Sequence, residues 1–170
     1  MSVAPVVVTY LERGCEASEL AKLSPPPFVL RREQAPSAAN VALALYVRVG
    51  GPWQWTDRLP WTEEQWTSAI HRDDVELWVA WIGEEVVGYF ELHVEQDGVE
   101  LKYFGLLPEH TGRRLGGALL MAAVDRASAI GKNRMTVNTC TLDHPAALGN
   151  YIKHGFRVLR TEIRQPVATP

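Results

Sequence analysis

Alternating apolar and polar residues in the middle of the chain predict β-strands. Residues 75–82 and 86–95 have this period of two and are separated by a turn at Gly83-Glu84-Glu85. The Asp97-Gly98 turn then leads into residues 99–107, which begin with alternation and end in a wholly apolar run. The three segments predict an antiparallel meander whose last strand passes from a half-exposed to a buried position.

Apolar residues at helical spacing predict helices before and after this meander. Residues 37–49 carry such a stripe up to the breaker Gly50-Gly51-Pro52, and Thr62-Glu63-Glu64-Gln65 has the form of a capping box at the start of a second helix. Residues 115–129 form a long amphipathic pattern, and residues 145–154 predict a short helix with Pro145 at its first position.

Four further segments are rich in β-branched or aromatic residues and predict strands: residues 6–11, 28–33, 134–139 and 156–163. A meander followed by helix, strand, helix and strand indicates an α/β domain of the α+β kind, with a mixed sheet. A length of 170 residues suits a single domain that spans residues 1–170.

Composition narrows the functional classes. Hydrophobic residues make up 46% and charged residues 22%, as in folded globular proteins. The formal net charge is -3, so the protein lacks the positive field that favours nucleic-acid partners. The sequence shows neither the pattern of a signal peptide nor an apolar stretch long enough to span a membrane, so no membrane partner is expected. Two distant cysteines, Cys15 and Cys140, favour a reducing, cytoplasmic compartment. The histidines show no metal-ligand spacing, so no metal is expected.

The segment from Leu106 to Ala118 carries the clearest chemical signal. It runs from a buried strand through a loop containing Gly112, Arg113 and Arg114 into a helix. The unpaired N–H groups and positive dipole end of such a helix suit a phosphate, and glycines allow close approach. A tight structural connection without a ligand is the alternative interpretation.

This segment resembles the acyl-CoA pyrophosphate-binding motif of the GNAT superfamily of N-acetyltransferases, roughly [Arg/Gln]-x-x-Gly-x-[Gly/Ala]. The motif aligns with Thr111 to Gly116. Thr111 then stands where the family usually has Arg or Gln, and Arg114 stands where it usually has Gly. A register shifted to Arg113-x-x-Gly116-x-Ala118 also matches, but it moves the helix relative to the preceding strand, so we prefer the first alignment.

A second segment resembles another motif of this family, Asn-x-x-Ala-x-x-x-Tyr-x-x-x-Gly-Phe. Ala147, Tyr151 and Gly155-Phe156 keep its spacing, and His144 stands at the Asn position as the expected helix N-cap. The chain is identified as a member of the GNAT superfamily on these two motifs, and the match covers residues 75–163 well.

The resemblance implies the GNAT fold: a twisted, mostly antiparallel sheet of six or seven strands with about four flanking helices. The sheet would split between the fourth strand and the fifth, with the splayed fourth strand falling on Gly105, Leu106 and Leu107. Acceptor-side helices would occupy residues 37–71, and the acetyl-CoA-binding core would occupy residues 75–163.

Acetyl-CoA is the cosubstrate that the resemblance implies. The splayed strand would offer backbone N–H groups to the thioester and pantetheine arm, and the loop and helix would hold the pyrophosphate. The implied contacts are Gly105, Leu106, Leu107, Thr111, Gly112, Arg113, Arg114, Leu115, Gly116, Gly117, His144, Ala147 and Tyr151.

Two residues are expected to be catalytic. Tyr151 matches the family's general acid, since a phenol is protonated at neutral pH and can donate; simple packing is the alternative. Glu100 lies on the strand position where some members carry a catalytic carboxylate, and apolar neighbours favour its partial burial. A solvated glutamate opposite Lys102 is the alternative, and His93 and Glu91 compete for the role of base.

Four tryptophans gather in the loop and helix that follow the first predicted helix. Trp53 and Trp55, together with Asp57, are expected to bind a cationic amine through cation-π and charge contacts. Anchoring of the loop to the sheet is the equally weighted alternative for these indoles.

The expected function is transfer of an acetyl group from acetyl-CoA to a primary amine of a small molecule or peptide. By resemblance the amine would attack directly, without an acyl-enzyme, and a homodimer is a family-level option. A noncatalytic acyl-CoA binding or sensing module is the alternative, because Thr111 and Arg114 depart from the motif.

Overall fold

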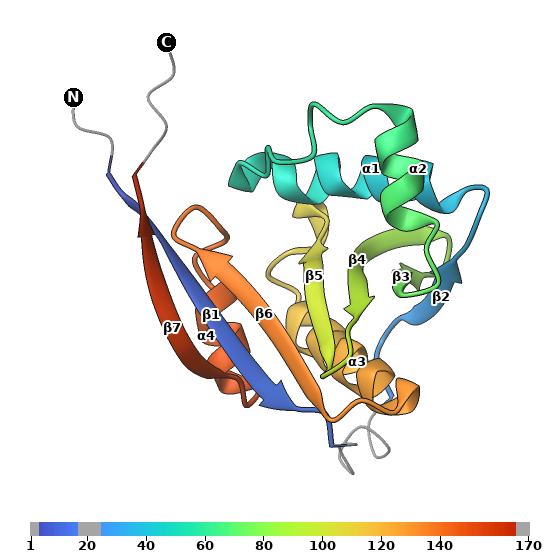
Figure 1. The fold of residues 1–170 in the computed structure, drawn as a ribbon. Helices are drawn as coiled ribbons and strands as arrows, with labels where there is room; N and C mark the ends of the chain where they lie inside the picture. The colour runs from blue at the N-terminus through green and yellow to red at the C-terminus, as the bar shows by residue number, and fades with distance from the viewer. Residues whose placement is uncertain (1–3, 17–24, 166–170) are drawn as a thin grey trace.

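The computed structural model describes residues 4–16 and 25–165, and its elements surround one seven-stranded sheet (Figure 1). The strands are β1 (Val6–Gly14), β2 (Val29–Glu33), β3 (Val75–Ile82), β4 (Glu85–Val94), β5 (Val99–Leu106), β6 (Arg134–Cys140) and β7 (Arg157–Arg164). The helices are α1 (Ala38–Gly50), α2 (Glu63–Ile70), α3 (Leu115–Ile130) and α4 (Ala147–Lys153), with short 3-10 turns η2 (Gly51–Trp53) and η3 (Pro108–His110).

The strand order is β2-β3-β4-β5-β6-β1-β7, and β5 and β6 are the parallel pair in an otherwise antiparallel sheet. These two strands pair only at their starts, where Val99 lies opposite Met135 and Glu100 lies opposite Thr136. Beyond that point they diverge (Figure 1). The expected mixed sheet is confirmed, and the expected split lies beside the strand that carries Gly105 and Leu106. In chain order this strand is the fifth, so the split falls between the fifth and sixth strands and not between the fourth and fifth.

The N-terminal strand β1 inserts between β6 and β7 and is antiparallel to both. Tyr10 lies opposite Asn138 on one side and opposite Arg160 on the other. β1 and β7 therefore complete the half of the sheet beyond the split, although they come from opposite ends of the described chain.

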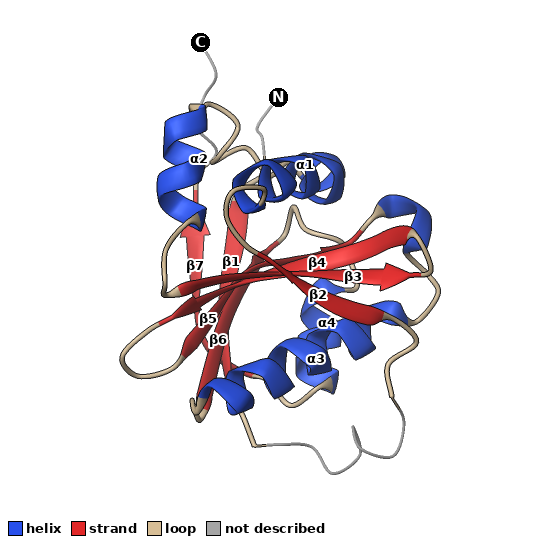
Figure 2. Cartoon of the chain, turned by 90° about the vertical axis from the view of Figure 1, so that its right-hand side faces the viewer, coloured by secondary structure: helices blue, strands red, loops and turns tan. Residues whose placement is uncertain are grey.

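Helices cover both faces of the sheet (Figure 2). On one face α3 buries Leu119, Leu120 and Val124 in a cluster with Leu11 and Phe156. On the other face a second cluster joins α1 and α2 to β3 and β4. No helix in the described ranges is long and apolar enough to cross a membrane.

The helix starts test two sequence predictions. The α2 capping box is confirmed, because Thr62 Oγ1 accepts from the Gln65 N–H (3.2 Å) and Gln65 Oε1 accepts from the Thr62 N–H (2.8 Å). The predicted start of α4 at Pro145 is wrong, as is His144 as its N-cap. The Ala146 N–H donates to His144 Nδ1 (3.0 Å) and the Ala147 N–H donates to His144 O (2.9 Å), which makes a turn ahead of the helix.

Candidate active site

A cavity of about 990 Å³ lies where β5 and β6 diverge. It reaches from the loop after α1 to the first turns of α3 and α4, and β1 and β7 contribute to its wall. The sequence-predicted residues on its lining are Trp53, Trp55, Asp57, Glu100, Gly105, Leu106, Thr111, Gly112, Arg114, Leu115, Gly116, Gly117, His144, Ala147 and Tyr151. One cavity thus brings together residues that the sequence predicted separately to be catalytic, to bind the cosubstrate and to bind the acceptor.

Leu107 and Arg113 do not line this cavity. Leu107 is buried in the α1–α2 cluster, and its N–H donates to Val87 O at 2.9 Å. The Arg113 guanidinium lies 3.0 Å from Nδ1 of the buried His110. The Leu107 N–H and the Arg113 guanidinium, which the resemblance assigned to the cosubstrate, are thus engaged with other groups of the protein.

The N-terminus of α3 is left open toward the cavity. Its N-cap residue, Arg114, makes no side-chain cap, and the first turn contains no acidic residue. The N–H groups of the first turn of a helix have no partner within the helix, so here they are available to an anion. The loop reaches this position through two left-handed residues, Gly112 (φ 76°) and Arg114 (φ 60°). Glycine favours that conformation, and glycine is the residue that the resemblance expects at position 114.

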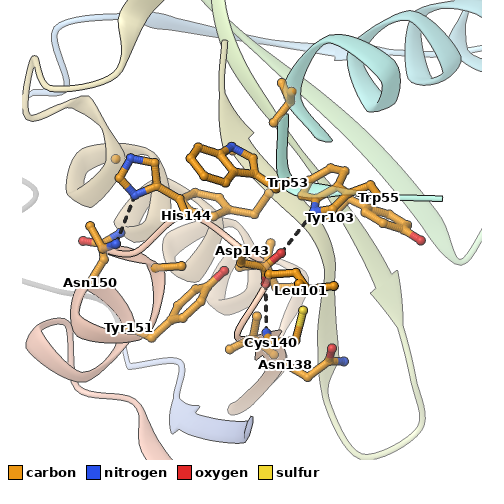
Figure 3. A pocket seen from close by; sticks show the side chains of 18 of the residues that line it. Trp53, Trp55, Leu101, Tyr103, Asn138, Cys140, Asp143, His144, Asn150 and Tyr151 are labelled. Atoms are coloured by element: carbon orange, nitrogen blue, oxygen red, sulfur yellow. Dashed lines mark hydrogen bonds between the residues drawn. The ribbon is translucent and has the colours of Figure 1, made fainter. Parts of the chain in front are cut away.

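Tyr151 packs between two aromatic neighbours. Its ring centroid lies 6.1 Å from that of Phe104 and 5.5 Å from that of Phe156. Its hydroxyl points into the cavity toward Asp143 (Figure 3). Burial raises the pKa of Tyr151 well above its ordinary value, and the negative charge of Asp143 raises it further. The phenol therefore keeps its proton at neutral pH.

The three candidate bases differ in their surroundings. Glu100 lies on the cavity wall with Oε1 3.5 Å from Lys102 Nζ, and its side chain is partly exposed. Glu91 is buried and accepts hydrogen bonds from Arg58 at 2.7 and 2.8 Å, while His93 Nε2 lies 2.6 Å from its Oε1. Glu91 is therefore engaged with both Arg58 and His93, whereas Glu100 lines the cavity.

The predicted tryptophan cluster divides into two parts. Trp53 and Trp55 line the cavity, and the Trp55 ring centroid lies 5.1 Å from that of Tyr103. Trp61 and Trp66 instead pack on the Arg58 guanidinium, at 4.7 and 5.5 Å from Cζ to the ring centroids. Trp61 and Trp66 thus fit the anchoring interpretation, whereas acceptor binding by Trp53 and Trp55 stays a prediction that their place on the cavity wall allows.

Asp57 lies at the cavity but is occupied by tyrosines. Its Oδ1 accepts from the Tyr46 hydroxyl at 2.6 Å, and its Oδ2 accepts from the Tyr103 hydroxyl. Burial acts to raise the pKa of Asp57, but the hydrogen bonds from Tyr103 and Tyr46 outweigh it and hold this pKa below its usual range. Asp57 stays ionised, and it orients the aromatic wall.

Asp143 is a cavity residue that the sequence reasoning did not single out. Its Oδ1 accepts from Trp55 Nε1 (3.2 Å), and its Oδ2 accepts from the Cys140 N–H (3.0 Å) (Figure 3). The same Oδ2 also accepts from Thr139 Oγ1 (2.6 Å). These contacts tie the loop after α1 to the loop after β6 across the opening. The Trp53 and His144 rings meet beside them, with centroids 4.9 Å apart.

Asn138, Cys140 and Asn150 also line the cavity without having been predicted. Asn138 alternates with buried residues along β6, a signal that was present in the sequence.

Within residues 4–16 and 25–165, no three His, Cys, Asp or Glu side chains gather in a way that could hold a metal ion.

Comparison with known proteins identifies the family. Residues 40–156 match the acetyltransferase (GNAT) family, which is more than half of the chain. The chain belongs to the GNAT acetyltransferase family. Curated protein sequences gave no match.

Solved structures share the fold at low sequence identity. A GCN5-related N-acetyltransferase from Sphaerobacter thermophilus superposes with a TM-score of 0.66 and 14% identity, over 95% of this chain and 51% of that chain. The ribosomal-protein-S18-alanine N-acetyltransferase from Escherichia coli superposes with a TM-score of 0.56 and 16% identity, over 74% of this chain and 76% of that chain.

An aminoglycoside acetyltransferase from an uncultured soil metagenomic sample, in complex with trehalose, gives a TM-score of 0.62 and 13% identity, over 75% of this chain and 86% of that one. A functionally unknown conserved protein from Staphylococcus epidermidis superposes with a TM-score of 0.66 and 16% identity, over 96% of this chain and 63% of that chain. The chain therefore spans between half and two thirds of the length of several structures that it matches almost end to end.

Proposed function

We propose that this protein is an acetyl-CoA-dependent N-acetyltransferase that acts on a primary amine of a small molecule or a peptide. The open N-terminus of α3 beside a cavity that also contains Tyr151 is the observation that carries this proposal. Family membership supports acetyl transfer as the class of reaction.

The residues around the split in the sheet fit acetyl-CoA. Leu115, Gly116 and Gly117 would offer first-turn N–H groups to the pyrophosphate, with Gly112 and Arg114 beside them. Gly105 and Leu106, on the part of β5 that has left β6, would offer the strand edge to the pantetheine arm. When bound, acetyl-CoA supplies an activated acetyl thioester.

Tyr151 would act as the general acid. Its hydroxyl holds a proton because burial and the Asp143 carboxylate raise its pKa, and no described residue accepts that proton in a hydrogen bond. Phe104 and Phe156 fix the ring, so the proton is held at one place in the cavity. Glu100 is the candidate base, because it lines the cavity and a carboxylate there would accept a proton from an amine that attacks directly.

The acceptor would enter beside Trp53, Trp55 and Tyr103. Aromatic faces and the ionised Asp57 favour a cationic amine. The E. coli structure bears the name of a protein N-acetyltransferase and the metagenomic one that of an aminoglycoside acetyltransferase, so both a peptide and a small amine are candidates for this site.

The proposal also covers the domain, its compartment and its assembly. Residues 1–170 would form a single GNAT domain. The two free cysteines, Cys15 and Cys140, favour a reducing compartment such as the cytoplasm. A homodimer is the proposed assembly, to be checked by light scattering.

The test measures acetyl-CoA binding by calorimetry and release of free thiol against a panel of polyamines, amino acids, aminoglycosides and short peptides. We expect binding and thiol release that depends on one class of acceptor. Binding without release across the panel would favour the acyl-CoA sensor instead, and absence of binding would refute both.

A further inference from the structure

The carboxylate of Asp143 joins two loops that lie on opposite sides of the main cavity. Its Oδ2 accepts from the Cys140 N–H at 3.0 Å and from Thr139 Oγ1 at 2.6 Å, which holds the side chain in the turn between β6 and α4. Its Oδ1 accepts from Trp55 Nε1 at 3.2 Å, in the loop after α1 (Figure 3). Asp143, Trp55 and Tyr151 all line the cavity. A residue of the turn before α4 therefore holds part of the wall that is proposed for the acceptor.

The ring of Trp55 is placed by close packing and by an unusual backbone conformation. Its centroid lies 5.6 Å from that of Tyr46 and 5.1 Å from that of Tyr103. A Cβ at Gly50 would lie 2.2 Å from Cδ2 and Cε3 of the indole, so glycine at the end of α1 leaves the room that the ring occupies. The preceding residue, Gln54, is left-handed (φ 58°), a conformation that residues with side chains rarely adopt and that is typical of functional sites. Packing thus places the indole, and Asp143 holds its N–H edge.

An aspartate suits position 143 because hydrogen-bond donors face both of its oxygens. An ionised carboxylate has two accepting oxygens, whereas an asparagine amide has one accepting oxygen and a donating NH2 group. The Cys140 N–H belongs to the backbone and can only donate. An asparagine here would therefore keep its oxygen at Cys140 and turn its NH2 toward Trp55 Nε1, so that two donors would face each other. A carboxylate satisfies Trp55 and the turn at the same time.

The same carboxylate lies beside the proposed general acid. The Tyr151 hydroxyl points toward Asp143 (Figure 3). Burial raises the pKa of Tyr151, and the negative charge of Asp143 raises it further, so the two groups are close enough to interact. The bond from Trp55 to Asp143 therefore fixes the indole relative to the proton that Tyr151 holds.

We infer that Asp143 is a positioning residue for the acceptor: its carboxylate fixes Trp55, and with it the aromatic wall of the acceptor site, relative to Tyr151. This inference rests on the proposed function, because it needs an amine acceptor. It gives the turn before α4 a part in recognising the acceptor, in addition to the cosubstrate contacts proposed for the same segment.

The test compares two variants that break this contact with two that leave it intact. Asp143→Asn sets two donors against each other, and Trp55→Phe keeps an aromatic ring but removes the donor. Thr139→Val is the control for the first variant, because it removes a different hydrogen bond of the same carboxylate and Thr139 does not line the cavity. Trp61→Phe is the control for the second variant, because Trp61 packs on Arg58 and does not line the cavity.

The contact itself is measured through the indole ¹H–¹⁵N signals of the protein. The signal that is missing in Trp55→Phe belongs to Trp55. We expect this signal to move upfield in the proton dimension in Asp143→Asn, because the indole N–H loses its acceptor, and to stay in place in Thr139→Val. An unmoved signal in Asp143→Asn would overturn the inference and leave the proposed function standing.

The role in acceptor binding is measured by steady-state kinetics. The probe is the amine that gives the fastest thiol release among the polyamines, amino acids, aminoglycosides and short peptides of the panel. Asp143→Asn and Trp55→Phe should each raise the acceptor KM about tenfold, the effect of losing one hydrogen bond to a charged group. The double variant should be no worse than either single variant, because both changes break the same contact.

The other kinetic constants separate positioning from chemistry and from folding. In Asp143→Asn we expect kcat and the dissociation constant of acetyl-CoA to stay within about threefold of the wild type at neutral pH, since burial alone keeps Tyr151 protonated. Thr139→Val and Trp61→Phe should keep the acceptor KM of the wild type. Urea unfolding of all four variants records any loss of stability separately.

Four results would overturn the positioning role. They are an unchanged acceptor KM in Asp143→Asn, a fall in its kcat at constant KM, an equal rise of the acceptor KM in Thr139→Val, and additive effects in the double variant. The second of these would place Asp143 in the chemical step instead. Absence of thiol release by the wild type with every amine of the panel would refute the proposed function and the positioning role together.

Discussion

The N-termini of α2 and α3 differ in how they are capped. At α2, the Thr62 and Gln65 side chains close a capping box, and Glu63 and Glu64 complement the helix dipole. At α3, Arg114 provides no cap and the first turn has no acid. Side chains of the protein therefore cap the N-terminus of α2, whereas the N–H groups at the N-terminus of α3 are available to an anionic ligand.

The same contrast extends to the side chains around each helix. Near α2, Arg58 is paired with Glu91, and the Tyr46 and Tyr103 hydroxyls both donate to Asp57. Near α3 and α4, the Tyr151 hydroxyl, Lys153 and Arg114 have no described partner. Hydrogen-bonded polar groups hold the acceptor-side loop in place, whereas the Tyr151 hydroxyl and Arg114 lie on the wall of the cavity where a ligand is proposed.

The largest effect on stability is expected from removing the buried ion pair near α2. Arg58→Met would leave Glu91 buried with His93 as its remaining partner, and loss of one member of a buried ion pair costs about 3–5 kcal/mol. Urea unfolding should show this loss, while the folded variant binds acetyl-CoA as the wild type does. A loss below about 1 kcal/mol would mean that the pair adds little.

The same pair predicts a pH dependence. Burial acts to raise the pKa of Glu91, but hydrogen bonds from His93 and Arg58 lower it overall. Since the pKa is lower in the folded state, this contribution to stability is complete above the ordinary value of 4.5 and is lost as the pH falls below it. The Arg58→Met variant should lose less stability over that acidic range.

The next effect is on turnover. Tyr151→Phe removes the unpartnered hydroxyl, and loss of a general acid typically lowers kcat about 100-fold, with acetyl-CoA affinity within about threefold. Tyr89→Phe is the control, because the Tyr89 hydroxyl is buried without a hydrogen-bond partner among the described residues and Tyr89 does not line the cavity. We expect that control to keep its kcat. Unchanged turnover in Tyr151→Phe would remove this residue from the mechanism.

A smaller effect is expected from charging the open helix end. Gly116→Glu would place a carboxylate beside the pyrophosphate and weaken acetyl-CoA binding about 30-fold. Gly116→Ala is the steric control, since its Cβ would have no neighbour closer than 3.7 Å. Calorimetry should find Gly116→Ala within a few-fold of the wild type, and equal affinity of the two variants would contradict a pyrophosphate at this turn.

The smallest effect concerns the closed helix end. Thr62→Ala removes the α2 cap and should lower the free energy of unfolding by about 1 kcal/mol, with no change in acetyl-CoA affinity. If acetyl-CoA binding weakened in parallel with stability, the two helix ends would not be independent.

Local patterns predicted most of the fold. The α2 capping box, the 75–107 meander and the extent of α3 follow from spacing and turn residues, and the structure places them within a residue or two of the expected limits. The insertion of β1 between β6 and β7 depends on pairing between residues at least 120 positions apart, which periodicity does not encode.

The site divides along the same line. The α3 loop and the Tyr151 helix are contiguous motifs, so their residues could be named from the sequence. The bond from Trp55 to Asp143 joins residues 88 positions apart, and the occupation of Asp57 by two tyrosines depends on α1 packing against β5. No local pattern indicates which partner such a side chain will meet.

The most direct measurement of the central contrast is the change in backbone amide ¹H–¹⁵N shifts when acetyl-CoA is added. The account predicts large changes at Gly112 and at Leu115, Gly116 and Gly117, and none at Glu63 to Gln65. Unchanged α3 amides in a protein that still binds acetyl-CoA would contradict it.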